Sequence, residues 1–465
     1  AGNYTLSGYA DKLNISVKKG ITDSENNVVL NLDGLMVDNS SMTTDQSVIE
    51  IGKDNSNVVI NIKGDNKIIG ASTFTAAPEA IIAMKANTTT SVPTLTLKGD
   101  SDATLSIMDS MSTDTEYGDQ DPADGISSKG AVVIESGIYN IYTNGDCIKG
   151  TGSSLAEGDG GVTVTGGTLN LKSYLGNGIK SKNGVITISG GTVNSNYTYE
   201  DAINAKNYSA NITGGTVNID NCYGDGIQGE NVNISDGTVN IKTYYEYAGK
   251  NFYDTALGTG NYNTLTKINS SKTETVNVDT GSHKGIKAGT KAKTYSYTSV
   301  ADGSKYTAGQ TYSQEASGGL IISGGTINID TTKTGIKYNG SAGGSAPGSG
   351  NEGPGGSQPG SGGPEGSQGG GGTPPSGNPG QGGNSGNSGS TTDSNGQVAA
   401  ASDGGDVQYI IGCPEDGIHS NNTTSITGGT ITIKAADDGI ASTESLDVTG
   451  ASTVINIETA YEGIE

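Results

Sequence analysis

Carboxylates recur along this chain at the first position of a short repeated phrase, Asp-Gly-Ile or a near copy. This position is held by Asp124, Asp146, Asp201, Asp225, Asp416, Asp438 and Glu462. Where no insertion intervenes, successive copies lie 22 to 24 residues apart. A repeat of this length predicts one supersecondary unit stacked on itself, which would align the carboxylates in a column.

Such a column favours a divalent cation. Two carboxylates about 4.8 Å apart, the spacing of adjacent strands, repel by roughly 3 kcal/mol at an effective dielectric constant of about 20. Repeated repulsion calls for a counter-ion, and hard oxygen ligands favour calcium, which we predict as the cofactor. Alternatively, each aspartate caps its turn by accepting backbone N–H groups, with Lys149, Lys180 and Lys206 balancing the charge. Both roles can hold at different positions.

Tyrosines gather just before the repeated phrase and in the segment that follows the regular repeats. The candidate carbohydrate-binding residues are Tyr174, Tyr197, Tyr199, Tyr223, Tyr244, Tyr245 and Tyr247. Exposed rings on a rigid face can stack on the apolar faces of sugar rings. Tyrosine is also common in strands, so a scaffold role stays open.

Asparagines form a second periodic set: Asn170, Asn194, Asn218, Asn240 and Asn328. They lie on the outward side of a predicted strand. Their stacked amides can hydrogen-bond to one another, which is a structural role, or they can present a hydrogen-bonding face to sugar hydroxyls.

The repeat also predicts the fold class. Between residues 161 and 180 apolar residues alternate with polar ones, with Val162, Val164, Leu169, Leu171 and Ile179 inside. Glycine pairs supply positive-φ corners between the short strands. Three strands and three corners in about 24 residues predict an all-β parallel β-helix, a solenoid with about 24 residues per rung.

Composition divides the chain into four parts. Residues 1–110 are predicted to be irregular, capping rungs, and 111–339 regular rungs with long Tyr-rich loops at 244–318. Residues 340–396 form a flexible insertion rich in Gly, Pro and Ser. Residues 397–465 are predicted to continue the same solenoid. A linker between independent domains is the alternative, but so few later rungs would not be stable alone.

Charge and composition exclude several partners. The formal net charge is -23 and the chain contains no arginine, so nucleic acid is not an expected partner. No apolar run is long enough to cross a bilayer, so we expect no transmembrane segment. An acidic surface rich in Asn and Thr suggests an extracellular or cell-surface location.

The three cysteines, Cys147, Cys222 and Cys413, form no evident disulfide framework.

Several phrases resemble a known family in their joint order. They are Asp124–Lys129, Asp201–Lys206, the opening Gly2–Gly8 and Leu30–Gly34. These resemble the bacterial carbohydrate-binding, polysaccharide-lyase-like β-helix family typified by a clostridial cellulose-binding protein. The resemblance implies an extracellular right-handed parallel β-helix that binds calcium and plant-type polysaccharide, including cellulose and pectin. Asn177, Lys284 and Thr334 depart from the phrase, which puts metal binding at those rungs in doubt.

The sequence therefore predicts a non-catalytic, calcium-dependent polysaccharide-binding protein. One alternative is a pectate-lyase-like enzyme with a lysine base. It is disfavoured because arginine is absent and because the carboxylates beside Lys149 and Lys180 would raise the pKa of these lysines. The histidines His283 and His419 form no nucleophile–base motif. Another alternative is a structural surface protein, a homo-oligomer or filament assembling through solenoid ends that expose strand edges.

Overall fold

The computed structural model describes the strands and most turns of the chain. The described residues are 2–18, 28–42, 46–52, 57–71, 80–85, 92–109, 123–152, 160–222, 224–243, 255–257, 264–269, 272–277, 284–296, 310–332, 336–339, 408–411 and 416–465. They fall into two compact units. The first comprises Ala1–Phe252, Thr280–Ile336 and Ile411–Glu465, and the second comprises Tyr253–Asp279 and Lys337–Ile410.

The first unit contains a 12-stranded parallel sheet of very short strands. In sheet order these are β2 (Ile15–Val17), β4 (Ile49–Ile51), β7 (Ala80–Met84), β10 (Asp124–Ser128), β13 (Ile148–Gly150), β16 (Ile179–Ser181), β19 (Ile203–Asn204), β21 (Ile227–Gly229), β26 (Ile286–Ala288), β33 (Ile418–Ser420), β36 (Asp438–Ser442) and β39 (Glu462–Ile464).

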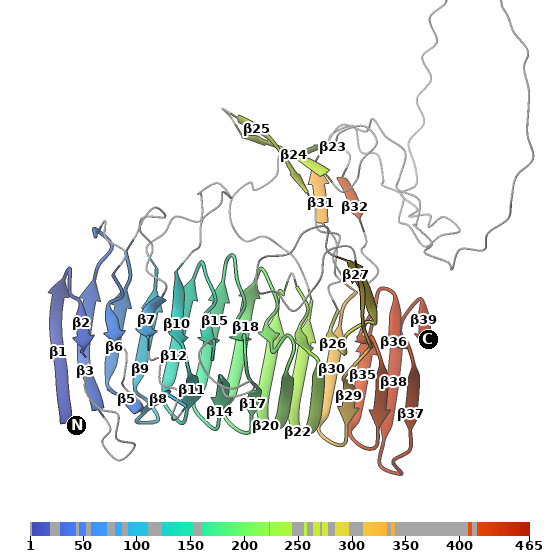
Figure 1. The fold of residues 1–465 in the computed structure, drawn as a ribbon, viewed down its shortest axis with the longest axis horizontal. Helices are drawn as coiled ribbons and strands as arrows, with labels where there is room; N and C mark the ends of the chain where they lie inside the picture. Colours follow the sequence, from blue (N-terminus) through green and yellow to red (C-terminus); the bar gives the residue numbers. More distant parts are fainter. Residues whose placement is uncertain are drawn as a thin grey trace, which may run out of the picture. The chain divides into compact units, whose positions relative to one another are not determined.

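The other strands of this unit that pair in parallel form a 20-stranded sheet. In chain order they are β1 (Gly2–Asp11), β3 (Val28–Asp38), β5 (Asn57–Lys63), β6 (Asp65–Ile69), β8 (Thr94–Gly99), β9 (Thr104–Met108), β11 (Ala131–Ile134), β12 (Ile138–Thr143), β14 (Gly161–Val164), β15 (Thr168–Ser173), β17 (Ile186–Ile188), β18 (Thr192–Thr198), β20 (Ser209–Asp220), β22 (Asn231–Lys242), β29 (Gly319–Ile322), β30 (Thr326–Asp330), β34 (Thr423–Ile426), β35 (Thr430–Lys434), β37 (Ser445–Val448) and β38 (Val454–Thr459). Strands of successive layers lie side by side (Figure 1).

The alternating residue pattern determines which side chains enter the core. In β15, Leu169 and Leu171 are fully buried, whereas Asn170 between them points outward and is half-buried. Ile179 of β16 belongs to the same apolar cluster, so the two sheets close around one core. The predicted positive-φ corners are present: Gly191 has a φ of 72°, and a Cβ there would lie 2.5 Å from the carbonyl oxygen of Gly167.

The predicted fold class, a right-handed parallel β-helix with about 24 residues per rung, is wrong as stated. Continuous strands such as β20 and β22 join the two outer strand columns into a single sheet, so the strands form a closed wall of two sheets. The spacing is also uneven: stacked asparagines are separated by 22 residues at Asn218 and Asn240 but by 88 at Asn240 and Asn328. Insertions at the corners lengthen individual layers without changing the strand register, as where β22 pairs with β30 and β30 with β35.

Strands on both sides of the Gly-, Pro- and Ser-rich segment belong to the same sheets. β33 pairs with β26, β34 with β29 and β35 with β30, all in parallel. Residues 340–396 themselves lie outside the described residues, and the predicted domain boundaries stay predictions.

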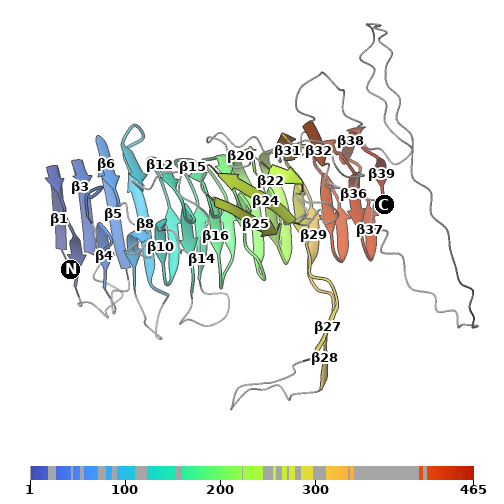
Figure 2. The same cartoon turned by 90° about the horizontal axis from the view of Figure 1, so that it is seen from above.

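The remaining described strands pair outside the two large sheets. In the first unit, β27 (Lys293–Ser296) and β28 (Thr311–Gln314) form an antiparallel pair (Figure 2). In the second unit, β23 (Thr255–Leu257), β24 (Thr264–Asn269) and β25 (Lys272–Asn277) form an antiparallel sheet. β31 (Ile336–Asn339) and β32 (Gln408–Ile411) form a two-stranded sheet. None of the described segments is a helix with the length and apolar character required to cross a membrane.

Candidate functional site

The repeated phrase places one residue per layer at the entrance to the 12-stranded sheet. We call this set the acid column: Asp124, Asp146, Asn177, Asp201, Asp225, Lys284, Asp416, Asp438 and Glu462. Backbone hydrogen bonds hold it in register, as where the Ala202 N–H donates to the Asp225 carbonyl at 3.1 Å. The glycine of the phrase permits this close stacking, because a Cβ on Gly178 would lie 2.6 Å from the Ala202 carbonyl oxygen.

Side chains of the acid column cap the backbone of the next layer. Asp124 Oδ1 accepts the Asp146 N–H at 2.9 Å, and Asp201 Oδ1 accepts the Asp225 N–H at 2.7 Å. Asn177 preserves the pattern because its amide oxygen accepts the Asp201 N–H at 3.1 Å. Capping is therefore an observed role of the column, and it uses only one oxygen of each carboxylate.

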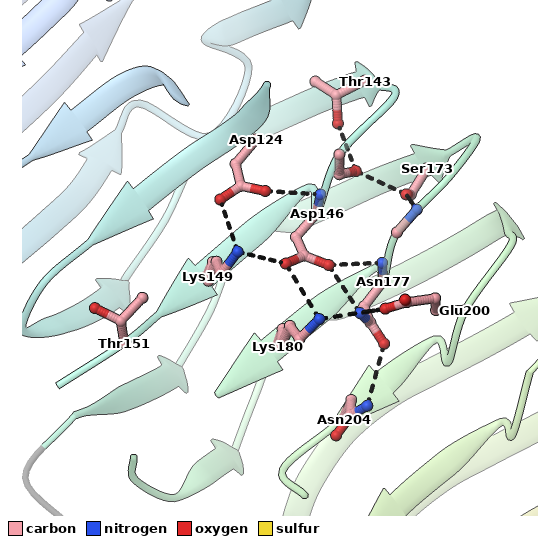
Figure 3. A network of polar contacts seen from close by, with 12 residues as sticks. Asp124, Thr143, Asp146, Lys149, Thr151, Ser173, Asn177, Lys180, Glu200 and Asn204 are labelled. Carbon is pink, nitrogen blue, oxygen red and sulfur yellow. Dashed lines mark hydrogen bonds and ion pairs between the residues drawn. The ribbon is translucent and has the colours of Figure 1, made fainter. Parts of the chain in front are cut away.

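A second column, three residues further along each phrase, faces the remaining oxygens. This partner column contains Ser127, Lys149, Lys180, Asn204, Gln228, Lys287, His419 and Ala441, which pair in register. Lys149 Nζ lies 3.2 Å from Asp124 Oδ2 and 3.0 Å from Asp146 Oδ2 (Figure 3). Lys180 Nζ lies 3.6 Å from Asp146 Oδ2. Lysines of the partner column, and not the exposed Lys206, thus neutralise these layers.

These contacts give neighbouring carboxylates opposite pKa shifts. Burial acts to raise the pKa of Asp146, but the ammonium groups of Lys149 and Lys180 outweigh it and hold this pKa below its ordinary value. Burial and the nearby charge of Asp146 raise the pKa of Asp124 to about 7. Lys149 is therefore shared by two buried carboxylates, of which only Asp146 also has Lys180 nearby.

The partner column lacks a lysine beside Asp201. Its Oδ2 instead accepts a hydrogen bond from Asn204 Nδ2 at 2.6 Å. In the next layer Gln228 Nε2 donates to Asp225 Oδ2 at 3.3 Å, and Lys287 Nζ lies 2.9 Å from the same oxygen. Burial and the proximity of Asp225 raise the pKa of Asp201 well above its ordinary value, and burial also raises that of Asp225. Asp225 thus has an ion pair with Lys287, whereas Asp201 is contacted by the neutral amide of Asn204.

An unpartnered oxygen marks the same place. Asn204 is only 9% exposed, and its Oδ1 has no hydrogen-bond partner. A buried amide oxygen without a partner is costly unless something else satisfies it. The Asn204 Nδ2 faces Asp201 here, and a half-turn of this amide would add its oxygen to those of Asp201 and Asp225 as hard donors for a divalent cation.

A second acidic group lies near the end of the sheet. Ligand oxygens of Asp416, Asp437 and Asp438 lie within 4.8 Å of one another. Lys284 Nζ at 2.5 Å and His419 Nδ1 at 2.6 Å already contact Asp416 Oδ2. Burial, together with a hydrogen bond to Glu465, raises the pKa of Asp438 to about 7. Glu462 is exposed.

Several residues that contact the acid column were not identified from the sequence. They lie three positions after the first residue of the phrase, or directly before it. Asn204, Gln228, Lys287 and His419 were not recognised, although their constant offset is visible in the sequence. Asp437 was also missed, although it immediately precedes Asp438.

The predicted tyrosine platform is only partly present. Tyr174 and Tyr199 are half-buried, whereas Tyr197 is 5% exposed and packs on Tyr174 with ring centroids 5.6 Å apart. A register shift after Leu171 aligns Tyr197 with Lys172, so the outward alternation is interrupted. Tyr223, Tyr244, Tyr245 and Tyr247 lie outside the described residues.

Tyr142 extends the tyrosine group on the neighbouring layer. It is half-buried, and Lys172 Nζ lies 5.7 Å from the centre of its ring. Together Tyr142, Tyr174 and Tyr199 present partly exposed aromatic surface close to a cation, an arrangement suited to contact with sugar rings.

The parallel strands stack in layers, with ordered polar columns and partly exposed tyrosines, and this arrangement defines a repeat protein. The sequence model of carbohydrate-binding domain-containing proteins matches residues 1–194 and, a second time, residues 166–342. The chain belongs to this carbohydrate-binding family, which confirms the family resemblance and identifies polysaccharide as its ligand class. No curated protein and no solved structure matches the chain.

Proposed function

We propose that this protein is an extracellular, calcium-dependent and non-catalytic polysaccharide-binding protein. The observation that carries the proposal is the Asp201–Asp225 pair with the unpartnered Asn204 oxygen, in a chain of a carbohydrate-binding family. The acidic balance, a formal net charge of -23, suits an extracellular surface rich in divalent cations.

The oxygens of the Asp201–Asp225 pair are suitable ligands for calcium. Calcium accepts six to eight oxygen ligands in flexible geometry, from carboxylates, amide oxygens and water. A half-turn of the Asn204 amide would direct Oδ1 toward a cation beside Asp201 Oδ2, which at present accepts the Nδ2 group. Asp201, Asp225 and Asn204 would hold the ion, and Gln228 stands beside them.

The ion would also contribute to glycan binding. Three or four protein oxygens leave coordination positions of calcium open to water or to a ligand oxygen. A uronate carboxylate is such a ligand, so acidic pectin-type chains fit this edge of the sheet. Tyr174 and Tyr199 would contact the sugar rings, since their rings are partly exposed.

The lysines of the site are poorly suited to proton abstraction. Burial acts to lower the pKa of Lys149, but Asp124 and Asp146 outweigh it and raise this pKa well above its ordinary value. A general base requires a pKa close to the working pH, which needs the opposite shift. This electrostatic setting supports binding without lyase chemistry.

A glycan array probed with and without chelator tests the proposal. We expect binding to acidic polysaccharide in calcium, loss of that binding in chelator, and no growth of the ultraviolet absorbance of an unsaturated product on polygalacturonate. Absence of binding to every glycan in calcium would refute the proposal, and steady growth of the absorbance would replace it with an enzyme.

Replacing Tyr174 and Tyr199 together by Ala should weaken binding to acidic polysaccharide about thirtyfold, because each aromatic contact contributes on the order of 1 kcal/mol. Tyr9 and Tyr461 provide a matched control, since both are 68% exposed but lie on the first and last layers described. Their double replacement by Ala should leave the affinity unchanged. Equal losses in the two double variants would argue against a specific tyrosine contact.

A further inference from the structure

Lys287 contacts the oxygen of Asp225 that backbone capping does not use. The other oxygen, Asp225 Oδ1, accepts the Lys284 backbone N–H at 2.9 Å. Lys287 Nζ lies 2.9 Å from Asp225 Oδ2, and the Gln228 amide donates to the same oxygen at 3.3 Å. A second cation bound at Asp225 would therefore share its oxygen with an ammonium group.

The charge of Lys287 acts on both carboxylates of the proposed calcium site. Burial raises the pKa of Asp201 and of Asp225, and the Lys287 ammonium opposes this rise at both residues. The ammonium group thus stabilises the same two negative charges that a calcium ion would stabilise. Two cations beside one buried pair repel each other, so calcium and the Lys287 ammonium compete for this position.

The Lys287 side chain can leave Asp225 without a change in the fold. Its backbone is fixed in β26, where Lys287 pairs in register with Gln228 of β21. The Lys287 side chain is 26% exposed, whereas the side chain of Asp225 is 3% exposed. A lysine stem is flexible and its ammonium group is strongly hydrated, so rotation about the side-chain bonds can carry the charge into water.

The part of the acid column beside Lys149 is less suited to such an exchange. Lys149 contacts the carboxylates of both Asp124 and Asp146, at 3.2 and 3.0 Å. Lys180 Nζ lies 3.6 Å from Asp146 Oδ2 as well. Calcium there would have to displace two ammonium groups, whose charges together equal its own. We therefore expect the exchange at the pair of carboxylates beside Lys287.

We propose that Lys287 is a built-in competitor of calcium, so that calcium binding at Asp201 and Asp225 exchanges the Lys287 ammonium for the metal ion. This inference rests on the proposed calcium-dependent function and assigns the regulation of its site. A cation that has to be displaced first lowers the apparent affinity for calcium. The exchange therefore shifts calcium binding toward the affinities of extracellular modules, with dissociation constants of about 10⁻⁴ to 10⁻³ M.

Acetylation of the full chain with an N-hydroxysuccinimide ester, measured by peptide mass spectrometry, tests the exchange directly. We expect Lys287 to be acetylated several times faster in calcium than in chelator, because its ammonium group leaves the buried carboxylate for water. Lys291, an exposed lysine four residues further along, is the matched control and should react equally in both conditions. Equal acetylation rates of Lys287 in calcium and in chelator would overturn the inference.

The variant Lys287→Met should bind calcium about tenfold more tightly than the wild type, because the competing cation is removed. Lys291→Met removes the same charge from an exposed position and should match the wild type. Titration calorimetry with calcium chloride measures the affinities, and circular dichroism in calcium verifies folding. An unchanged or weaker affinity of Lys287→Met would overturn the inference, whereas the proposed function would survive because the wild type binds calcium. If the wild type binds no calcium, both fail.

Discussion

Replacing Lys149 by Met should destabilise the fold by about 3 kcal/mol at pH 8, because it leaves two buried carboxylates without their shared cation. Lys149 Nζ lies 3.2 Å from Asp124 Oδ2 and 3.0 Å from Asp146 Oδ2, and both carboxylates are almost fully buried. The estimate takes the lower end of the usual range because the Lys149 side chain is 24% exposed and Lys180 remains near Asp146. Urea denaturation measures the change in the free energy of unfolding.

Lys182→Met is the matched control, since Lys182 is exposed and adjoins the same sheet. It should change the unfolding free energy by less than about 0.5 kcal/mol. The cost of Lys149→Met should shrink at pH 4, where Asp124, whose pKa is raised to about 7, is protonated and no longer needs a cation. A cost below about 1 kcal/mol at pH 8 would show that the lysine does not neutralise the pair.

Calcium should raise the free energy of unfolding by about 2.7 kcal/mol when its concentration is 100 times the dissociation constant, because it binds only the folded state. The double variant Asp201→Asn with Asp225→Asn should lose this response and be at least as stable as the wild type in chelator. Asp33→Asn with Asp447→Asn is the control, since these aspartates are exposed. Its response to calcium should match that of the wild type.

Without calcium, stability should also depend on pH. The pKa values of Asp124, Asp201 and Asp225 are raised by burial, so the folded state binds more protons than the unfolded state between pH 4 and 7. The melting temperature in chelator should therefore rise as the pH falls from 7 toward 4.5. Calcium should flatten this rise. A wild type indifferent to both chelator and acid would favour capping as the sole role of the column.

The buried strand residues and the corners could be predicted from the sequence, because they depend on side-chain alternation and on glycine. Leu169 and Leu171 are buried as predicted, and Gly191 turns a corner with positive φ. The number of residues in each layer could not be predicted from the strand pattern alone. Insertions at corners leave the strand pattern intact, so the period of 22 to 24 residues holds only where none intervenes; stacked positions lie 22 residues apart at Asn218 and Asn240 but 88 apart at Asn240 and Asn328.

Part of the candidate site could also be predicted, because the repeat places equivalent residues of successive layers next to one another. Alignment of Asp201 with Asp225 follows from the repeat, whereas the importance of Asn204 depends on an unpartnered oxygen that only coordinates reveal. Tyr197 shows the limit of alternation: a register shift in β18 places it opposite the outward Lys172, yet its ring packs on Tyr174 and is buried. A single extra residue in a strand is not visible from composition or period.

Affinity electrophoresis in gels containing polygalacturonate tests the central claim most directly. The wild type should be retarded when calcium is present and should migrate freely in chelator, because the ion at Asp201 and Asp225 would supply the contact to uronate. The double variant Asp201→Asn with Asp225→Asn should migrate freely in both gels, while Asp33→Asn with Asp447→Asn should behave as the wild type. Free migration of the wild type in calcium, or equal retardation of the wild type and the Asp201/Asp225 variant, would contradict the account.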